Sequence, residues 1–159
     1  MLNIPPDKRG LFTDYDVKAL KEWRGKLDEI FKVNLLKNAK AIGKVKKIMP
    51  LLDGNDATDH TFSMKGNDNA VEMDLKGEKT FNVLLLQENI RKGQRVEKFI
   101  LEYWDNNQWK KATEGTTIGY KRLLKFPTIT ASKVRLRIES ARLQPALAEI
   151  GLYFEKKNE

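Results

Sequence analysis

The sequence of 159 residues contains no cysteine and a single histidine, His60. The lack of cysteine excludes disulfide bonds, a thiol nucleophile and zinc or iron–sulfur sites with cysteine ligands. One imidazole cannot build a multi-histidine metal site, and no Ser–His catalytic pair is visible. No apolar run reaches the roughly 18 residues of a membrane-spanning helix, and the first residues lack the pattern of a signal peptide. We therefore expect no membrane span and no leader in this sequence.

The net charge is +8, from 30 Lys plus Arg against 22 Asp plus Glu. Residues 1–50 carry +6 of it, and residues 51–159 carry only +2. The excess is densest between Lys37 and Lys47, where no aromatic residue is interleaved for stacking on nucleic-acid bases. This distribution favours a solvated surface, and we expect no nucleic-acid partner.

A helix is predicted near the N terminus. Thr13, with Asp16 three positions later, forms a variant of the capping box with Asp in place of Glu. The apolar residues that follow recur at spacings of three and four and form one stripe that needs a partner surface: Val17, Leu20, Trp23, Leu27, Ile30 and Phe31. From about Ala41 the pattern changes to short extended segments. We therefore divide the chain into residues 1–38 and residues 39–157.

The second part is predicted to be all-β. Val71–Leu75 and Val134–Ile138 alternate apolar and charged residues, as strands with one buried face do. Phe81–Leu86 is almost wholly apolar, which indicates a central strand covered on both faces. Asp105–Gln108 supplies the turn of a hairpin, and Leu147–Phe154 fits a closing strand. Several short strands without intervening helices predict an antiparallel β-sandwich or jelly roll, preceded by a short helical segment.

The order of four segments is specific. Leu2–Gly10 precedes the helix, and three further segments follow it: Phe81–Val96, Thr116–Pro127 and Pro145–Tyr153. The first segment and the helix resemble the end of the catalytic (β/α) barrel of retaining α-L-fucosidases, a class of glycoside hydrolases. The later segments resemble the discoidin-like domain that follows this barrel, a galactose-binding-domain-like jelly roll also called coagulation factor C-type. The resemblance implies that residues 1–38 are a terminal barrel fragment with its last helix.

In that family both catalytic carboxyl groups lie on the barrel, before the point where this sequence begins. The resemblance therefore implies a noncatalytic C-terminal accessory domain that packs on the catalytic barrel and binds carbohydrate weakly, with fucosylated or galactosylated glycans as partners. A purely structural or protein-interaction module without a sugar ligand is the alternative. The parent enzyme is expected to be periplasmic or secreted.

The loop Leu51–Asp59 gathers short oxygen-bearing side chains around a glycine, which suits calcium. Discoidin-like domains often hold a structural calcium in this loop, and the resemblance maps its ligands onto four residues: Asp53, Asp56, Thr58 and Glu149. The alternative is an Asx-rich turn that needs no metal. No other cofactor is expected.

Sugar contacts are predicted in two loops. In sugar-binding discoidin-like domains a His just after the calcium loop bonds a sugar hydroxyl, and His60 stands there. The loop after the central strand offers Glu88, Asn89 and Arg91, although Glu88 replaces the Arg of the galactose-type pattern. Contact with the barrel, or simple solvation, is the alternative for this second loop.

Aromatic residues flank the predicted hairpin turn. Trp104 is the candidate for the apolar face of a sugar ring, and Trp109 lies across the turn from it. The alternative is that they are core or cross-strand aromatics.

Overall fold

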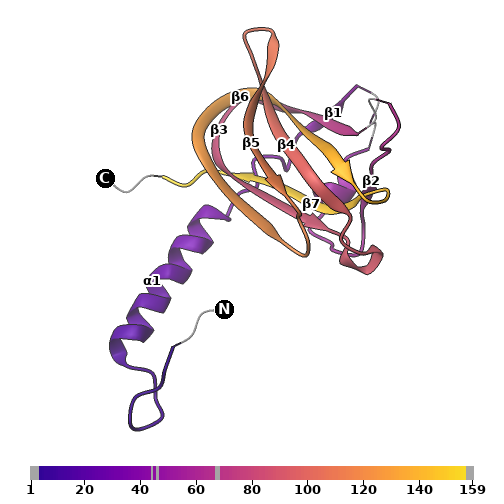
Figure 1. Ribbon diagram of the computed structural model, residues 1–159. Coiled ribbons are helices and arrows are strands. Elements are labelled where there is room, and N and C mark those ends of the chain that lie inside the picture. The colour runs from indigo at the N-terminus through magenta and orange to yellow at the C-terminus, as the bar shows by residue number, and fades with distance from the viewer. Residues whose placement is uncertain (1–3, 44, 46, 67–68, 157–159) are drawn as a thin grey trace. The chain divides into compact units, whose positions relative to one another are not determined.

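The computed structural model describes residues 4–43, 45, 47–66 and 69–156. The chain forms two compact units that divide between Val33 and Asn34, and each is described by itself (Figure 1). Among the described residues, no helix has the length and apolar character needed to cross a membrane.

The first unit contains one helix, α1 (Asp14–Ile30). Thr13 caps it as predicted, because its Oγ1 accepts a hydrogen bond from the Asp16 backbone N–H at 3.1 Å. The same hydroxyl donates to Asp16 Oδ2 at 2.7 Å, so Asp16 bonds the cap side chain. No residue of α1 is buried by the described parts of the chain, and Trp23 is 53% exposed. The predicted apolar stripe is therefore formed, and its residues are partly buried except for the exposed Trp23.

The second unit is antiparallel β-structure with two short 3₁₀ turns, η1 (Met49–Leu51) and η2 (Ile90–Lys92). The strands that the structure describes are β1 (Lys40–Ile42), β2 (His60–Thr61), β3 (Ala70–Glu88), β4 (Val96–Asp105), β5 (Gln108–Thr116), β6 (Arg122–Ala141) and β7 (Ala146–Tyr153). They pair in the order β2-β7-β3-β6-β4-β5, with β1 beside β3. The predicted β-sandwich is confirmed.

Two long strands, β3 and β6, create the two layers. The first half of β3 pairs with β1 and with the second half of β6, whereas its second half pairs with β7 and with the first half of β6. The register shifts between Asp74 and Lys79. There Lys76 and Gly77 have φ angles of 61° and 124°, a geometry that lets a strand bend. Both strands therefore cross between layers: β1, β4 and β5 complete the first layer, and β2 and β7 complete the second.

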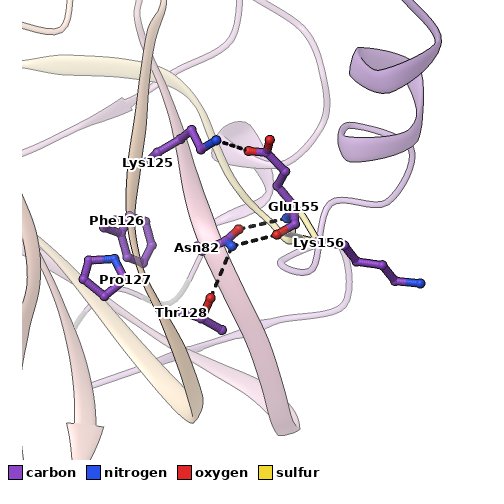
Figure 2. A pocket seen from close by; sticks show the side chains of 7 residues that line it. All are labelled: Asn82, Lys125, Phe126, Pro127, Thr128, Glu155 and Lys156. Atoms are coloured by element: carbon purple, nitrogen blue, oxygen red, sulfur yellow. Dashed lines mark hydrogen bonds and ion pairs between the residues drawn. The ribbon is translucent and has the colours of Figure 1, made fainter. Parts of the chain in front are cut away.

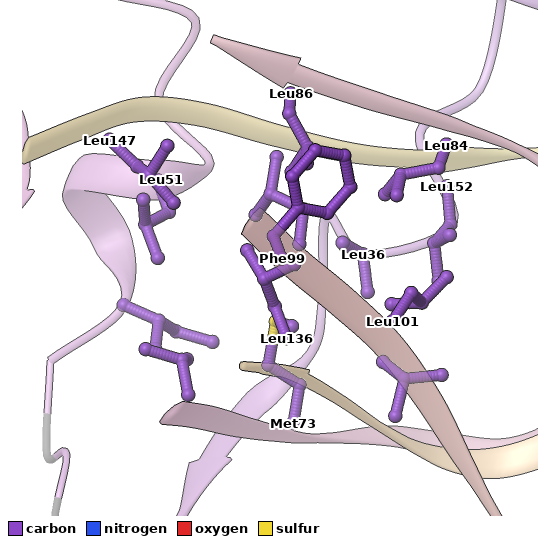
Figure 3. Packing of buried hydrophobic residues seen from close by; sticks show 14 of the residues in the cluster. Leu36, Leu51, Met73, Leu84, Leu86, Phe99, Leu101, Leu136, Leu147 and Leu152 are labelled. Carbon is purple, nitrogen blue, oxygen red and sulfur yellow. The ribbon is translucent and has the colours of Figure 1, made fainter. Parts of the chain in front are cut away.

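The core lies between the two layers (Figure 3). Buried apolar side chains reach it from both sides: Met73, Phe99, Leu101 and Leu136 from the first layer, and Leu84, Leu86, Leu147 and Leu152 from the second. Val71, Met73 and Leu75 are buried as the alternating pattern predicts. Every residue of Phe81–Leu86 is buried as well, so the prediction of a strand covered on both faces is confirmed.

The second unit begins earlier than the sequence pattern indicates. Asn34 Nδ2 donates to the Ile150 carbonyl at 3.2 Å, and Asn34 Oδ1 accepts the Leu152 N–H at 3.2 Å. Leu36 is completely buried in the sandwich core. Residues 34–38 therefore belong to the same compact unit as the sandwich, whereas the sequence-based division begins that domain at residue 39. A short edge segment of this kind has no periodic pattern that would mark it.

One buried carboxylate, Glu88 at the end of β3, ties three segments together. Glu88 is 2% exposed. Its Oε1 accepts the backbone N–H groups of Arg95 and Val96 at 2.7 and 2.9 Å, and its Oε2 accepts that of Gly119 at 2.8 Å. The Glu88 N–H in turn donates to the Gly119 carbonyl at 2.9 Å. These bonds fix the start of β4 and the segment before β6 against the end of β3.

We expect the substitution Glu88→Gln to lower the free energy of unfolding by about 2–4 kcal/mol, as measured by urea denaturation. The amide loses the charge that strengthens these bonds and must turn an N–H toward a backbone N–H. The matched control is Glu97→Gln, because Glu97 is a partly exposed carboxylate that bonds the side chains of Ser140 and Arg142. Only a small change is expected there. Equal losses in the two variants would contradict the role assigned to Glu88.

Candidate functional site

The loop between η1 and β2 closes on β7 through carboxylates. Asp53 Oδ1 accepts the Asn55 N–H at 2.9 Å, and Asp53 Oδ2 accepts the Thr58 hydroxyl at 2.7 Å. Glu149 of β7 accepts the Gly54 N–H at 3.0 Å. The structure thus brings together Asp53, Thr58 and Glu149, which are three of the four residues predicted to hold calcium.

The carboxylates of Asp53 and Glu149 are close enough to repel each other electrostatically. Burial raises the pKa of Glu149, and the charge of Asp53 raises it further, while the Gly54 N–H and Lys121 act in the opposite direction. A bound cation would relieve this arrangement, so the residues fit the predicted metal in charge.

The donor set of the loop is small for calcium. The Asp56 carboxylate turns toward Arg91, with Oδ1 3.6 Å from Nη2. Within the described residues no three His, Asp or Glu side chains are placed to hold a metal ion together. Calcium usually takes six to eight oxygen ligands, so backbone carbonyls and water would have to supply most of them.

His60, the first residue of β2, follows this loop and is half-buried. Its ring meets the Phe62 ring nearly at a right angle, with centroids 4.9 Å apart. Burial lowers the pKa of His60, and the charge of Asp59 only partly opposes this effect. The lowered pKa favours the neutral imidazole, which has one donor and one acceptor nitrogen.

Asp59 links β2 to the turn η2. Its oxygens accept hydrogen bonds from Asn89 Nδ2 at 2.8 Å and Lys92 Nζ at 2.9 Å. Burial acts to raise the pKa of Asp59, but these bonds hold it below its ordinary value. His60 and Glu88 are both register neighbours of Leu147 on β7, so His60 lies at the same end of the sandwich as the loop from β3 to β4. The sequence prediction omits Asp59, although its place beside the only histidine was an available signal.

We call the group His60, Asp59, Asn89, Arg91 and Lys92 the loop cluster. Asn89 is 3% exposed, and its Oδ1 caps η2 by accepting the Arg91 N–H at 3.2 Å. Glu88 is equally buried, with both oxygens bonded to backbone. Neither side chain is presented to solvent and both bond the protein itself, so Glu88 and Asn89 stabilise the loops here, and their predicted sugar contacts stay predictions. His60 and Arg91, whose side chain is 68% exposed, are the predicted contacts of this cluster that solvent reaches.

Trp104 lies at the other end of β4 from the loop cluster, next to the hairpin turn (Figure 1). The distance from Val96 to Trp104 along an extended strand is roughly 25 Å, so Trp104 and His60 cannot contact the same small sugar. Trp104 is a cross-strand aromatic, paired with Trp109 at 5.1 Å between ring centroids. It is not a core residue, because Tyr103 beside it packs on the core and successive strand side chains point to opposite faces.

A surface pocket of about 410 Å³ lies elsewhere, against β3, β6 and the C-terminal segment (Figure 2). Its lining consists of Asn82, Lys125, Phe126, Pro127, Thr128, Glu155 and Lys156. Asn82 bonds the Glu155 backbone carbonyl and N–H at 2.8 Å each, and Lys125 Nζ is 2.6 Å from Glu155 Oε2. These paired groups fix the C-terminal segment, and the pocket contains none of the predicted site residues.

Comparison with known proteins places this architecture. The model of the F5/8 type C domain matches residues 45–155. The putative alpha-L-fucosidase 1 of Oryza sativa subsp. japonica is 32% identical over 162 residues, which are 96% of this chain and 31% of the relative. The alpha-L-fucosidase 1 of Arabidopsis thaliana is 31% identical over 167 residues, covering 98% of this chain and 33% of the relative. The chain thus spans about a third of the length of these curated relatives and corresponds to a C-terminal part of them.

A solved structure gives the same result. The Ruminococcus gnavus GH29 fucosidase, determined as a mutant in complex with fucose, superimposes with a TM-score of 0.82 at 29% identity. The match covers 99% of this chain and 33% of that one. Since the family model spans well over half of the sequence, the chain belongs to the F5/8 type C, or discoidin-like, domain family.

Proposed function

We propose that the chain is a noncatalytic C-terminal accessory domain of an α-L-fucosidase. The supporting observation is that almost the whole chain, α1 included, matches about a third of each fucosidase relative. Retaining glycosidases use two carboxyl groups about 5 Å apart, facing the glycosidic bond. In this chain Asp53 and Glu149 of β7 instead accept hydrogen bonds from backbone N–H groups of the loop between η1 and β2, which suits a structural role.

This proposal is tested with an aryl α-L-fucoside. The purified chain is expected to release no aryl alcohol above the rate in buffer, because the groups that would attack and protonate the glycoside belong to another part of the enzyme. The positive control is a full-length α-L-fucosidase, with its catalytic domain, assayed in parallel. Turnover by the chain alone, retained after repeated purification, would refute the noncatalytic assignment.

The proposed partner is the catalytic domain of the same polypeptide. The apolar stripe of α1 supports this partner, since Trp23 is 53% exposed and no residue of the helix is buried. An amphipathic helix of this kind gains stability when its apolar face is covered, at about 25 cal/mol per Å². The alternative, a purely structural role without a sugar ligand, also requires that α1 contacts the catalytic domain. This contact therefore does not discriminate between the two roles.

Weak carbohydrate binding is the second part of the proposal, at the loop cluster. The neutral imidazole of His60 can donate and accept a hydrogen bond, and the exposed Arg91 guanidinium supplies several donors to sugar hydroxyls. Asp56, 3.6 Å from Arg91, helps to orient that guanidinium. Binding is expected to be weak because Glu88 and Asn89 are committed to the fold.

We expect isothermal titration with fucosylated and galactosylated oligosaccharides to show weak binding that His60→Ala and Arg91→Ala each reduce by about tenfold, the loss of one hydrogen bond to a charged or buried group. Arg142→Ala is the matched control, because Arg142 is 80% exposed and lies outside the loop cluster. Binding that persists unchanged in both loop variants would exclude these residues as contacts.

Calcium at Asp53, Thr58 and Glu149 is the third part of the proposal. The metal would neutralise the two carboxylates and fix the loop that leads to His60. We expect calcium to raise the unfolding temperature relative to a chelator, because binding to the folded state alone stabilises it. The rise should disappear in Asp53→Asn and Glu149→Gln but persist in Asp56→Asn, whose carboxylate faces Arg91.

The effect should also be larger at pH 7 than at pH 4. The raised pKa of Glu149 means that this carboxyl group takes up a proton earlier than usual as the pH falls, and the protonated group no longer attracts a cation. Identical unfolding temperatures in calcium and in chelator at pH 7 would favour the alternative of an Asx-rich turn without a metal.

A further inference from the structure

We propose that the outer face of the first layer carries a second binding platform, built on Trp104 and Trp109, for an uncharged oligosaccharide. It lies at the hairpin end of β4, roughly 25 Å along the strand from the loop cluster. It therefore does not depend on His60 or Arg91, and each of the two sites can be absent without the other.

The platform rests on Arg135, which two carboxylates hold on the outer face of the sheet and which contacts the Trp109 ring. Arg135 Nε is 2.7 Å from Glu102 Oε2, and Arg135 Nη1 is 3.5 Å from Glu72 Oε1. Glu72, Arg135 and Glu102 are register neighbours on β3, β6 and β4, so these carboxylates hold the guanidinium down on the outer face. The Trp109 ring lies over this guanidinium, with 4.5 Å from its centroid to Arg135 Cζ. One face of the Trp109 indole is thus covered by the arginine, and the side chain as a whole is partly exposed.

Trp104 forms a wall beside this floor. Its ring makes an angle of 70° with the Trp109 ring, and the centroids are 5.1 Å apart. Lys133 Nζ lies 5.8 Å from the Trp104 centroid and steadies this second ring from the neighbouring strand. The two indoles therefore form a fixed corner, in which a flat ring with one apolar face can stack at little cost in side-chain entropy.

The charges around the corner favour an uncharged ligand. On the outer face Arg135 is paired with Glu102 and Glu72, and Lys133 interacts electrostatically with Asp74, its register neighbour on β3. These pairs cancel locally, so the platform offers no excess charge to a polyanion. Two indole rings are also far less than the roughly 800 Å² per partner of a stable protein interface. A saccharide ring, which carries both apolar C–H faces and hydroxyl groups, can in contrast stack on an indole ring without a charged partner.

The experiment follows the indole N–H signals of the ¹⁵N-labelled chain in two-dimensional NMR spectra. The sequence has 3 Trp residues, so Trp23 serves as an internal control and single Trp→Phe variants assign the signals. The probes are cellohexaose, N-acetylchitohexaose and a fucosylated lacto-series oligosaccharide, with a sulfated oligosaccharide for comparison. We expect saturable shifts of the Trp104 and Trp109 signals with at least one uncharged probe, and none for Trp23.

Variants separate this platform from the loop cluster. Trp109→Ala should weaken binding of the uncharged probe by about tenfold or more, as loss of an aromatic stacking surface does. His60→Ala should leave the shifts at Trp104 and Trp109 unchanged. If circular dichroism shows that Trp109→Ala is unfolded, the test rests on the NMR titrations of the unsubstituted chain and of Trp104→Phe, in which the Trp109 signal must still shift and saturate.

Three results would overturn the proposal. The first is the absence of saturable shifts at Trp104 and Trp109 with every uncharged probe, and the second is a response to the sulfated probe only. The third is undiminished binding by a folded Trp109→Ala variant. If His60→Ala and Arg91→Ala leave binding unchanged while the Trp104 and Trp109 signals shift, only the loop cluster is rejected as a site. If those variants lose binding while the Trp signals do not shift, only the platform is rejected.

Discussion

The hydrogen bonds of the buried Glu88 carboxylate hold the loop end of the sandwich in place. A buried charge is costly unless it is fully bonded, and here three backbone N–H groups from two separate segments satisfy it. Asn89, the next residue, caps η2 and bonds Asp59 beside His60. The geometry of the loop cluster therefore follows from a carboxylate that itself touches no solvent.

The two long strands set the distance between the proposed sites. Because β3 and β6 belong to both layers, the sandwich has one continuous core. The pairing register of β4 with β6 then fixes the distance between the two ends of β4. The loop cluster lies where β4 starts, and the Trp corner lies where β4 ends. A domain that bound sugar at both places would contact an extended or branched glycan at two points, and weak single contacts would then reinforce each other.

Local patterns were enough to predict much of this fold. Alternation identified the inward residues of Val71–Leu75, the continuous apolar run identified the central strand, and Thr13 marked the start of α1. The role of Glu88 was not predictable, because a polar residue at the end of an apolar run resembles a loop residue. Its burial depends on N–H groups as far along the chain as Gly119. The stack of Trp109 on Arg135 likewise arises from the pairing register, which one strand alone does not reveal.

The anchoring of the segments that lead into and out of the sandwich has a mechanical consequence. Asn34 is bonded to β7 at Ile150 and Leu152, and Glu155 is bonded to Asn82 of β3, the strand beside β7. Tension along the polypeptide would therefore load the second layer first, at this edge, before it reaches β4, β5 and the two Trp residues at the hairpin. The first layer, to which neither of these anchoring segments is bonded, would therefore lie outside the main path of the load and could keep a ligand in place while the second layer is stretched.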